Sequence, residues 1–481
     1  MSNYKTVFFT LGILLIILAI AMLVPILFQL LYDQFNSTFI ISSIITVVFG
    51  ILFFLSNIDH QKLINTQQAF LLTALSWISI AVFGSLPFIL SDLNLSITDS
   101  FFESMSGITT TGSTIISDIE KTPKAILIWR SMLQWLGGIG IILMAITLMP
   151  IMNIGGMQLM KISSNDTSEK ILPKSRQISL RLILIYLLLT FFCALSYKFS
   201  GMNSFDSLSH AMTTVSTGGF SNYDQSIGYF NNSQIEIVSI IFILSGSIPF
   251  ISYIKFLSGD KKIIFNDEQI KLFLKMILIS VLILFIYLAI VNDNLFEVSI
   301  RSIIFNVVSI LTGTGYVTKE FDQWGNFPLI FFLILMFIGG CAGSTTCGIK
   351  IFRVHILYYF FRNQLLKIIY PRAIISLRYN NSNLDDKLIA SIISFVYLYI
   401  LIFFILSGLL TLTGLDFTTS ISGAASSLSN VGPGLGNEIG PNSNYSSLPN
   451  QSKWLLTIGM ILGRLEIFAI LIIFLPSFWR K

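Results

Sequence analysis

The chain has 481 residues, of which 54% are hydrophobic and only 11% are charged, and its formal net charge is +5. A soluble domain usually carries about a quarter charged residues, so this composition excludes a soluble globular protein and predicts an integral membrane protein. Continuous apolar runs, such as residues 182–192 and 276–291, favour transmembrane helices over the weak, alternating segments of a membrane β-barrel.

Two apolar runs begin the chain and predict two transmembrane helices, at residues 7–31 and about 39–55. The first run is too long for the apolar core of a signal peptide and lacks a small-residue cleavage site, so we expect a retained helix. This helix pair is assigned to residues 1–65.

After this pair, one pattern occurs four times: a long apolar helix, a short semi-polar helix, a glycine turn, a polar loop and a second long apolar helix. The short helices have about a dozen residues, too few to cross a bilayer. A half-crossing helix must be buried among other helices or face water, which predicts re-entrant pore helices. We therefore expect an all-α integral membrane fold with four pseudo-repeats around one pore, plus the two extra N-terminal helices. The four units are assigned to residues 66–160, 176–258, 268–360 and 384–481.

The element bounds follow from the same pattern. The short helices are expected at residues 98–109, 204–215, 296–311 and 417–429. The second long helices are expected at residues 125–152, 235–256, 328–358 and 454–478. Of these second helices, only the one in the third unit is expected to be broken.

A small turn with glycine follows each short helix, and these glycines recur at intervals of 106, 97 and 117 residues. Four such turns can surround one ion path with backbone carbonyl oxygens, and glycine permits the unusual backbone angles that this needs. The turns contain no Asp or Glu, which argues against a ring of carboxylates. An ordinary loop between helices is the alternative for any single turn. The candidate ion-binding residues are Thr110, Thr111, Gly112, Ser216, Thr217, Gly218, Gly313, Thr314, Gly315, Asn430, Val431 and Gly432.

The expected break in the third unit is the glycine-rich segment 339–348. Glycine, serine and threonine make a poor continuous helix, and unwound backbone is tolerated in mid-membrane where it faces a cavity. Close helix packing through small residues is the alternative. The candidate gate residues here are Gly339, Gly340, Gly343, Ser344, Thr345, Gly348 and, just after the segment, Lys350.

Arg464 is a further gate candidate, because it lies inside the last apolar run, where a charged side chain is costly. The alternative is an arginine paired with a carboxylate for packing. Glu466 is two residues away and faces elsewhere on a helix, so we expect a partner from another helix. Other ionisable residues near the short helices are expected to form structural bridges, caps or hydrogen bonds: Glu103, Arg130, Asp206, His210 and Arg301.

The basic residues predict the topology. If the N-terminus is cytoplasmic, the inner loops hold most of the Lys and Arg residues, in agreement with the positive-inside rule. No nucleic-acid partner is needed to explain the charge. The inner cations are Lys161, Lys170, Lys174, Arg176, Lys255, Lys261, Lys262, Arg353, Arg362, Lys367, Arg372 and Arg378.

The four turns, together with WLGGIGI (135–141), GGCAGST (339–345) and GRLEIF (463–468), resemble the TrkH/TrkG potassium-transport subunits, within the superfamily that includes KtrB and the plant HKT proteins. The resemblance covers essentially the whole chain, and the extra N-terminal helix pair resembles TrkH rather than KtrB. It implies potassium uptake across the bacterial inner membrane by a homodimer in which each protomer has its own pore. It also implies regulation by a cytosolic ring of TrkA-like RCK subunits that bind NAD or ATP.

The same resemblance implies that segment 339–348 is a movable loop under the filter and that Arg464 points into the pore below it. The family pattern has more glycine where Thr346 and Cys347 stand, a departure that could stiffen the loop.

Three classes of function compete at this point. A proton- or sodium-coupled potassium symporter is the alternative to a channel-like pore, but carriers usually have inverted repeats, whereas these four units share one orientation. An enzyme is not expected, because the apolar regions show no catalytic triad, metal cluster or paired acids. We expect no covalently bound cofactor, and potassium ions in the pore.

Overall fold

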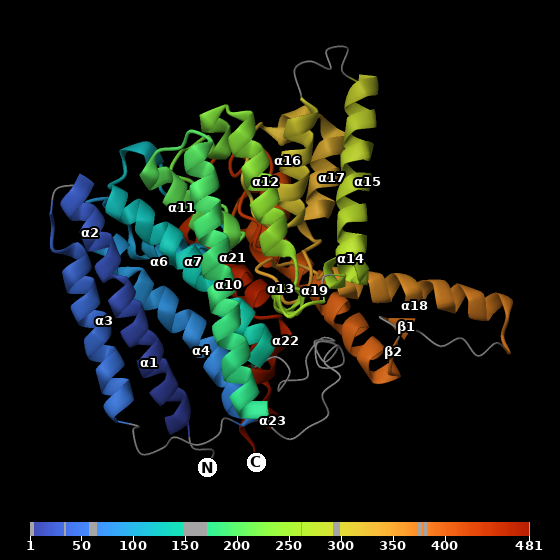
Figure 1. Cartoon of the computed structure of the whole chain (residues 1–481), viewed down its shortest axis with the longest axis horizontal. Coiled ribbons are helices and arrows are strands. Elements are labelled where there is room, and N and C mark those ends of the chain that lie inside the picture. Colours follow the sequence, from blue (N-terminus) through green and yellow to red (C-terminus); the bar gives the residue numbers. More distant parts are fainter. Residues whose placement is uncertain are drawn as a thin grey trace.

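The computed structural model describes residues 4–32, 35–56, 65–147, 171–260, 262–291, 299–372, 378–379 and 382–480. These residues are almost entirely helical, which confirms the predicted all-α fold. Among them, seven helices are long and apolar enough to cross a membrane, or up to nine if two sharply bent helix pairs each count as one span. Both chain ends lie on the same side of the molecule (Figure 1).

The N-terminal helices form a layer at one edge of the molecule, beside the first repeat (Figure 1). α1 (Lys5–Ala21) and α2 (Leu23–Tyr32) together form the first span, and α3 (Thr38–Leu55) forms the second. α1 packs against α3 at two glycines: a Cβ atom added to Gly12 would lie 2.7 Å from the carbonyl oxygen of Gly50. Such small residues let helix backbones approach closely within a membrane.

Four units follow, and each begins with a long helix and then a short one that ends in the interior. The long helices are α4 (Thr66–Gly84), α10 (Ile171–Phe199), α15 (Glu268–Val291) and α19 (Asp386–Leu412). The short helices are α6 (Ile97–Ile108), α11 (Ser204–Val215), α16 (Ile300–Leu311) and α20 (Phe417–Ser429). The predicted start of the third short helix, residue 296, lies outside the described residues.

Each short helix starts at a residue whose side chain accepts a hydrogen bond from a backbone N–H of the first turn, which is the usual N-cap. The four N-cap residues are Ser96, Asn203, Ser299 and Asp416. The same local device therefore fixes the start of the re-entrant helix in all four units.

The second long helices differ from one another more than the sequence predicted. α7 (Lys124–Thr147) is continuous, whereas the other three are split into α12 (Ser233–Ser247) and α13 (Phe250–Leu257), α17 (Asn326–Met336) and α18 (Ile351–Ile369), and α21 (Asn450–Arg464) and α22 (Phe468–Leu471). The prediction of a single break was wrong, because α12 and α13 meet at 89° and α21 bends by 104° into the segment that follows it.

Local backbone chemistry explains the two unpredicted breaks. Pro249 has no backbone N–H and disfavours the helical conformation in the residue before it, and Ile248 is indeed extended, with ψ 148°. Glu466 has φ 55°, in the left-handed region, which a non-glycine residue seldom adopts. A continuous helix over residues 235–256 or 454–478 is therefore excluded.

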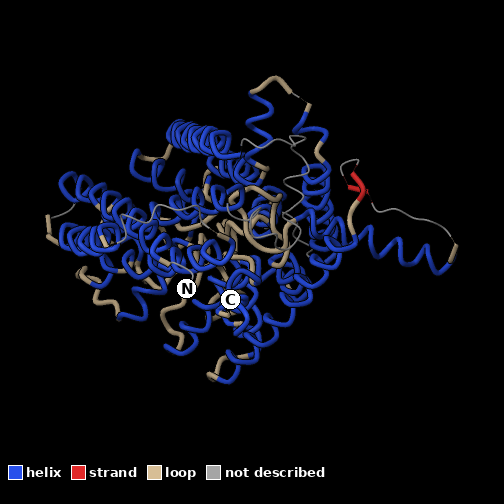
Figure 2. Tube along the Cα trace, turned by 90° about the horizontal axis from the view of Figure 1, so that it is seen from below, coloured by secondary structure: helices blue, strands red, loops and turns tan. Residues whose placement is uncertain are grey.

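The remaining elements are short connections. α18 projects sideways from the bundle (Figures 1 and 2), near a two-stranded hairpin. The short elements are α5 (Leu86–Ile89), η1 (Ile119–Lys121), η2 (Ser226–Phe230), α14 (Ile263–Asn266), η3 (Phe321–Trp324), β1 (Arg378–Tyr379), β2 (Ser382–Asn383), η4 (Ile472–Phe474) and α23 (Pro476–Trp479). Three cations used for the topology prediction, Lys161, Lys170 and Lys261, lie outside the described residues.

The contact between α1 and α3 generates a stability prediction. In Gly12→Ala, the new methyl would lie 2.6 Å from the backbone nitrogen of Phe54, and overpacking of this kind typically costs about 1–3 kcal/mol. We expect a lower midpoint of thermal unfolding for the purified protein in detergent. Gly408→Ala is the matched control, because nothing lies within 4 Å of that position. Equal midpoints for the two variants would contradict the packing assignment.

Candidate ion pathway

The four turns that follow the short helices share one backbone pattern. In each, three consecutive residues have a positive φ at the first and third positions. The first positions are Thr110 (53°), Thr217 (50°), Gly313 (71°) and Asn430 (54°). The third positions are Gly112 (88°), Gly219 (78°), Gly315 (79°) and Gly432 (108°). We call these triplets, residues 110–112, 217–219, 313–315 and 430–432, filter segments 1 to 4.

The second segment lies one residue later than predicted. The sequence prediction was Ser216, Thr217 and Gly218, but Ser216 is the C-cap residue of α11, and the residue equivalent to the other third-position glycines is Gly219. The error arises because two glycines are adjacent in STGGF, and the sequence pattern does not show which of them has the left-handed conformation. The other three predicted triplets occupy equivalent positions in the structure.

The filter segments close into a ring. At every junction, the third-position glycine of one segment faces the second-position carbonyl of the next. A Cβ atom on each glycine would meet that oxygen at a forbidden distance: Gly112 with Gly218 O at 2.3 Å, Gly219 with Thr314 O at 1.8 Å, Gly315 with Val431 O at 2.0 Å and Gly432 with Thr111 O at 2.8 Å. Because the last contact returns to segment 1, one chain completes the ring. Loop segments accordingly lie near the centre of the molecule, among helices (Figure 2).

Side chains behind the ring fix segments 1 and 4 to each other. The Asn430 amide donates hydrogen bonds to the Thr111 hydroxyl (2.9 Å) and to the carbonyl oxygen of Met460 (3.0 Å). The Ser113 hydroxyl donates to the carbonyl oxygen of Gly432 at 2.8 Å. All of these polar groups are buried, so the hydrogen bonds are needed to offset their removal from water.

A buried ion pair supports the residues that follow segment 1. Arg130, on α7, donates from Nε to Glu103 on α6 at 2.7 Å, and both side chains are fully buried. Glu103 also accepts a hydrogen bond from the backbone N–H of Ile115 at 2.8 Å. Arg130 Nη1 donates to the carbonyl oxygen of Ser221, just beyond segment 2, at 3.1 Å. The pair therefore ties two neighbouring turns together, which is the structural role expected from the sequence.

The other ionisable residues near the short helices have structural contacts of the same kind. The His210 ring nitrogens contact the backbone oxygen of Asp206 (2.9 Å) and the hydroxyl of Ser221 (3.1 Å). Arg301 forms an ion pair with Glu236 at 2.5 Å. These contacts hold the elements around the ring. None of the filter segments contains any of the ionisable residues expected to be structural, which are Glu103, Arg130, Asp206, His210 and Arg301.

The predicted gate segment, residues 339–348, leaves helical structure and packs into the break between α12 and α13. The backbone N–H of Thr345 donates to the carbonyl oxygen of Gly246 (3.2 Å). The backbone N–H of Phe250 donates to the carbonyl oxygen of Gly343 (2.9 Å). The unwound loop and the broken helix thus satisfy each other's free backbone groups. The Thr217 hydroxyl donates to the Thr345 hydroxyl at 3.0 Å, so this loop directly contacts filter segment 2.

Thr346 and Lys350 hold the loop together internally. The backbone N–H of Gly340 donates to the Thr346 hydroxyl at 3.1 Å. The buried ammonium group of Lys350 donates to the carbonyl oxygen and the hydroxyl of Thr346. A Cβ atom on Gly339 would lie 1.7 Å from the carbonyl oxygen of Cys347, so only glycine fits where the two ends of the loop meet.

Arg464 joins this loop to α7. Its Nη1 donates to the carbonyl oxygen of Thr345 (3.1 Å) and contacts Cys347 Sγ, and its Nη2 donates to the carbonyl oxygen of Gly137 (3.0 Å). The partners come from other elements, as expected. Glu466 instead pairs with Arg353 on α18. In the part of the chain that the structure describes, no carboxylate forms an ion pair with Arg464, so its buried charge is stabilised by carbonyl groups.

The space beside Arg464 is nearly closed. The guanidinium and the loop line a cavity of about 20 Å³, together with Ile141, Phe395 and Gly463. A cavity of that size holds about one water molecule, which is too little for a cation with its hydration shell.

A comparison with known proteins identifies the family. The TrkH family model, described as a cation transport protein, matches residues 35–481. The chain is 42% identical to the Trk system potassium uptake protein TrkI of Halomonas elongata over 415 residues, which are 86% of this chain and 84% of that protein. This chain belongs to the TrkH family of cation transport proteins. The membership confirms the resemblance seen in the sequence and places the chain in a transport family rather than among enzymes.

Other members agree over nearly the full length. The Trk system potassium uptake protein TrkH of Escherichia coli K12 is 34% identical over 458 residues, which are 93% of this chain and 92% of that protein. The crystal structure of the potassium transporter TrkH from Vibrio parahaemolyticus matches with a TM-score of 0.92 and 32% identity, over 99% of this chain and 100% of that one. The arrangement of elements described above is therefore a TrkH-family fold.

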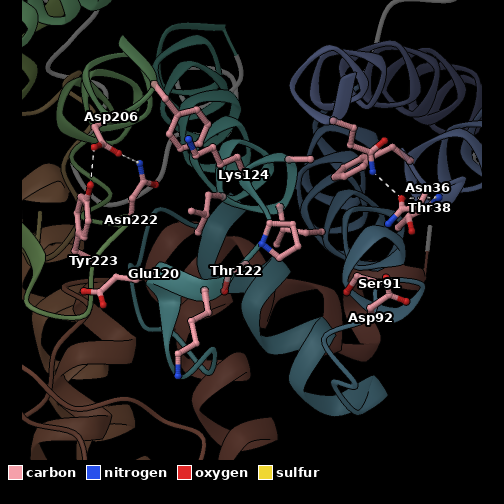
Figure 3. A pocket seen from close by; sticks show the side chains of 18 of the residues that line it. Asn36, Thr38, Ser91, Asp92, Glu120, Thr122, Lys124, Asp206, Asn222 and Tyr223 are labelled. Atoms are coloured by element: carbon pink, nitrogen blue, oxygen red, sulfur yellow. Dashed lines mark hydrogen bonds between the residues drawn. The ribbon is translucent and has the colours of Figure 1, made fainter. Parts of the chain in front are cut away.

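A second, larger cavity of this TrkH-family chain lies between the N-terminal helices and the first two repeats, and has a volume of about 490 Å³ (Figure 3). Asp206 points toward Asn222 and Tyr223 there and accepts hydrogen bonds from both, at 2.8 and 2.7 Å. The Lys124 ammonium lies 4.2 Å from the centre of the Tyr32 ring. Among the described residues, none of the filter segments lines this cavity, so it is separate from the ring.

The buried ion pair generates a prediction for this subsection. Glu103→Ala leaves the Arg130 guanidinium buried without its carboxylate, a change that typically costs about 3–5 kcal/mol. We expect a large fall in the thermal unfolding midpoint of the purified protein. Lys121→Ala is the control, since it removes an exposed ammonium group whose pKa is raised by its hydrogen bond to Asp118, and exposed pairs contribute little. A Glu103→Ala variant as stable as the control would contradict the assigned role.

Proposed function

We propose that this chain takes up potassium ions across the bacterial inner membrane through the ring formed by its four filter segments. The observation that carries the proposal is the closure of that ring within one chain, with a backbone carbonyl at every junction. Family membership supports it, because the relatives are described as potassium uptake proteins and the structural neighbour as a potassium transporter.

The chemistry of the ring suits a monovalent cation. Carbonyl oxygens can replace the hydration shell of a potassium ion without any charged ligand. The four short helices end at the ring, and helix C-termini carry a partial negative charge that favours a cation there. None of the filter segments contains Asp or Glu, the ligands that a divalent cation would favour.

The proposed potassium-binding residues follow the register of the structure. They are Thr110, Thr111, Gly112, Thr217, Gly218, Gly219, Gly313, Thr314, Gly315, Asn430, Val431 and Gly432. Ser216 leaves the predicted set and Gly219 joins it.

The proposed gate is the pair formed by loop 339–348 and Arg464. The loop touches segment 2 through Thr345, and the guanidinium holds the loop against Gly137 of α7. A buried positive charge on the ion path opposes a passing cation. Opening would then require the loop to release Arg464 and to leave the break between α12 and α13.

The assembly and the topology are also part of the proposal. Because one chain completes the ring, each protomer of a homodimer would have its own pore. We infer a cytoplasmic N-terminus from the distribution of Lys and Arg. Loop 339–348 would need a signal from outside the ring in order to move. We infer that a cytosolic RCK subunit that binds NAD or ATP supplies this signal, on the basis of the resemblance to Trk systems.

A proton- or sodium-coupled potassium symporter of the same superfamily is the alternative. It would use the same ring but would move potassium only with a second ion gradient. The closed cavity beside Arg464 suits either mechanism, since both need a gate.

The decisive test is ion flux into liposomes that contain the purified chain, with and without proton and sodium gradients. We expect potassium flux well above sodium flux. In Gly315→Ser, the added side chain would start 2.0 Å from the carbonyl oxygen of Val431 and is strained at φ 79°. We therefore expect the potassium-to-sodium flux ratio to fall by about tenfold. Equal fluxes of the two ions in the unaltered chain would refute the proposal, and potassium flux only with a second gradient would favour the symporter.

Removal of Arg464, the proposed gate arginine, should increase the potassium flux. Arg464→Ala deletes a buried charge and the hydrogen bonds to Thr345 and Gly137, so we expect severalfold faster potassium flux in the same liposomes. Arg480→Ala is a control that removes an exposed arginine after α23. No gain in flux for Arg464→Ala relative to this control would count against the gate.

A further inference from the structure

Filter segment 2 lacks a side chain that the other three segments have. The middle residue is Thr111 in segment 1, Thr314 in segment 3 and Val431 in segment 4, all β-branched, whereas segment 2 has Gly218. The φ angle of Gly218 is not in the left-handed region, so the backbone conformation does not require glycine there. The reason for the glycine must be the space around it.

The side chain of Gln134 occupies that space. Gln134 lies on α7 of the first repeat and is completely buried. A Cβ atom added to Gly218 would lie 2.4 Å from the amide carbon of Gln134. The amide of Gln134 therefore takes the position that a side chain of residue 218 would otherwise occupy.

Two hydrogen bonds hold the Gln134 amide, one to segment 2 and one to the residue that follows it. Its Nε2 donates to the carbonyl oxygen of Gly218 at 2.6 Å, and its Oε1 accepts from the backbone N–H of Phe220 at 3.0 Å. A backbone N–H needs an acceptor and a carbonyl needs a donor, so these partners fix which end of the amide faces which group. A side-chain amide bound at both ends holds the local backbone in one orientation.

This contact makes the carbonyl oxygen of segment 2 differ from those of the other three segments. Gly218 O is one of the four carbonyls at the ring junctions, and it is hydrogen-bonded to Gln134. Among the described residues, no hydrogen-bond donor contacts the equivalent oxygens of Thr111, Thr314 or Val431. A hydrogen-bond donor polarises the carbonyl oxygen that it contacts, so the Gly218 carbonyl dipole differs from those of Thr111, Thr314 and Val431.

We propose that Gln134 is a specificity-determining positioning residue of the ion pathway. It supplies from α7 the side chain that segment 2 lacks, and it sets the direction and strength of the Gly218 carbonyl dipole. This inference rests on the proposed function, since it assigns a role within the same ring. The residue acts through the carbonyl of Gly218 and not by contact with the ion.

The position of Gln134 on α7 fits this role. Arg130 lies one helical turn earlier on the same face and donates to Ser221, just beyond segment 2. Gly137, nearly one turn later, accepts the hydrogen bond from Arg464. One face of α7 thus contacts the turn beyond the ring, the ring itself and the gate arginine. The contacts on either side of Gln134 along the helix fix its position beside segment 2.

The test compares potassium and sodium flux ratios in liposomes for two substitutions of Gln134. Gln134→Met keeps the length of the side chain but removes both hydrogen bonds. Gln134→Glu retains an acceptor for Phe220 but has no donor for Gly218 O when ionised. Both variants lose the hydrogen bond to Gly218 O, so we expect each to lower the potassium-to-sodium ratio by about fivefold, the usual scale for that one buried hydrogen bond. Trp135→Phe is the matched control on the same helix, because it removes the indole hydrogen bond to Thr190, away from the ring, and should keep the ratio.

A pair of substitutions tests the shared space directly. Gly218→Thr alone should abolish selective flux, since the new side chain would collide with the Gln134 amide. Gly218→Thr combined with Gln134→Ala removes the collision but also removes the donor to the carbonyl oxygen of residue 218. Potassium flux should therefore return, while the potassium-to-sodium ratio stays about fivefold below that of the unaltered chain. A merely space-filling role for Gln134 predicts that the ratio recovers as well.

The outcomes separate the two proposals. A selective unaltered chain whose ratio is unchanged in both Gln134→Met and Gln134→Glu overturns this inference alone. Loss of both variants from the membrane, with Trp135→Phe retained and no rescue by the double substitution, overturns it in favour of a folding role. An unaltered chain without preference for potassium overturns the proposed function, and this inference with it.

Discussion

The ring at the centre of this protein depends on the absence of four side chains. At the third position of each filter segment, the neighbouring carbonyl oxygen lies where a Cβ atom would be, at distances from 1.8 to 2.8 Å. The same positions have φ between 78° and 108°, so glycine is required there both by conformation and by space. The capped short helices, which end just before the ring, and the buried pair of Arg130 and Glu103 bring the four turns close enough for this contact.

Unwound backbone inside a membrane has to find internal partners, and this requirement explains the arrangement next to the ring. The break between α12 and α13 leaves backbone groups that loop 339–348 satisfies, and the loop in turn is bonded to Arg464. Glu466, in the break of the last helix, pairs with Arg353 beyond the loop. Three broken helices therefore form one interlocked unit that contacts segment 2, which provides a physical route by which movement of the loop could alter the ring.

Much of the fold could be predicted from the sequence, because hydropathy and the Ser- and Thr-rich short helices are local signals. The four units, the last short helix at residues 417–429 and three of the four filter triplets follow from such signals. The second triplet was displaced because adjacent glycines at 218 and 219 look alike in sequence. Pro249 is a local sequence signal for the break after α12, whereas no residue type in the sequence marks the break at Glu466.

The contacts of the site were harder to predict, because they join residues far apart in the chain. Arg464 stood out as a charge in an apolar run, but its bonds to Gly137 and Thr345 depend on the tertiary fold. Gln134 carries no charge, and its contact with Gly218 depends on the tertiary fold and on the register of segment 2, so the sequence alone did not single it out.

The central claim is that cations bind on the axis of the ring. The most direct measurement is anomalous diffraction from crystals soaked in rubidium, a heavier substitute for potassium. We predict a peak surrounded by the carbonyl oxygens of Thr111, Gly218, Thr314 and Val431. A ring without any peak, with rubidium only at carboxylates such as Asp206, would contradict the claim.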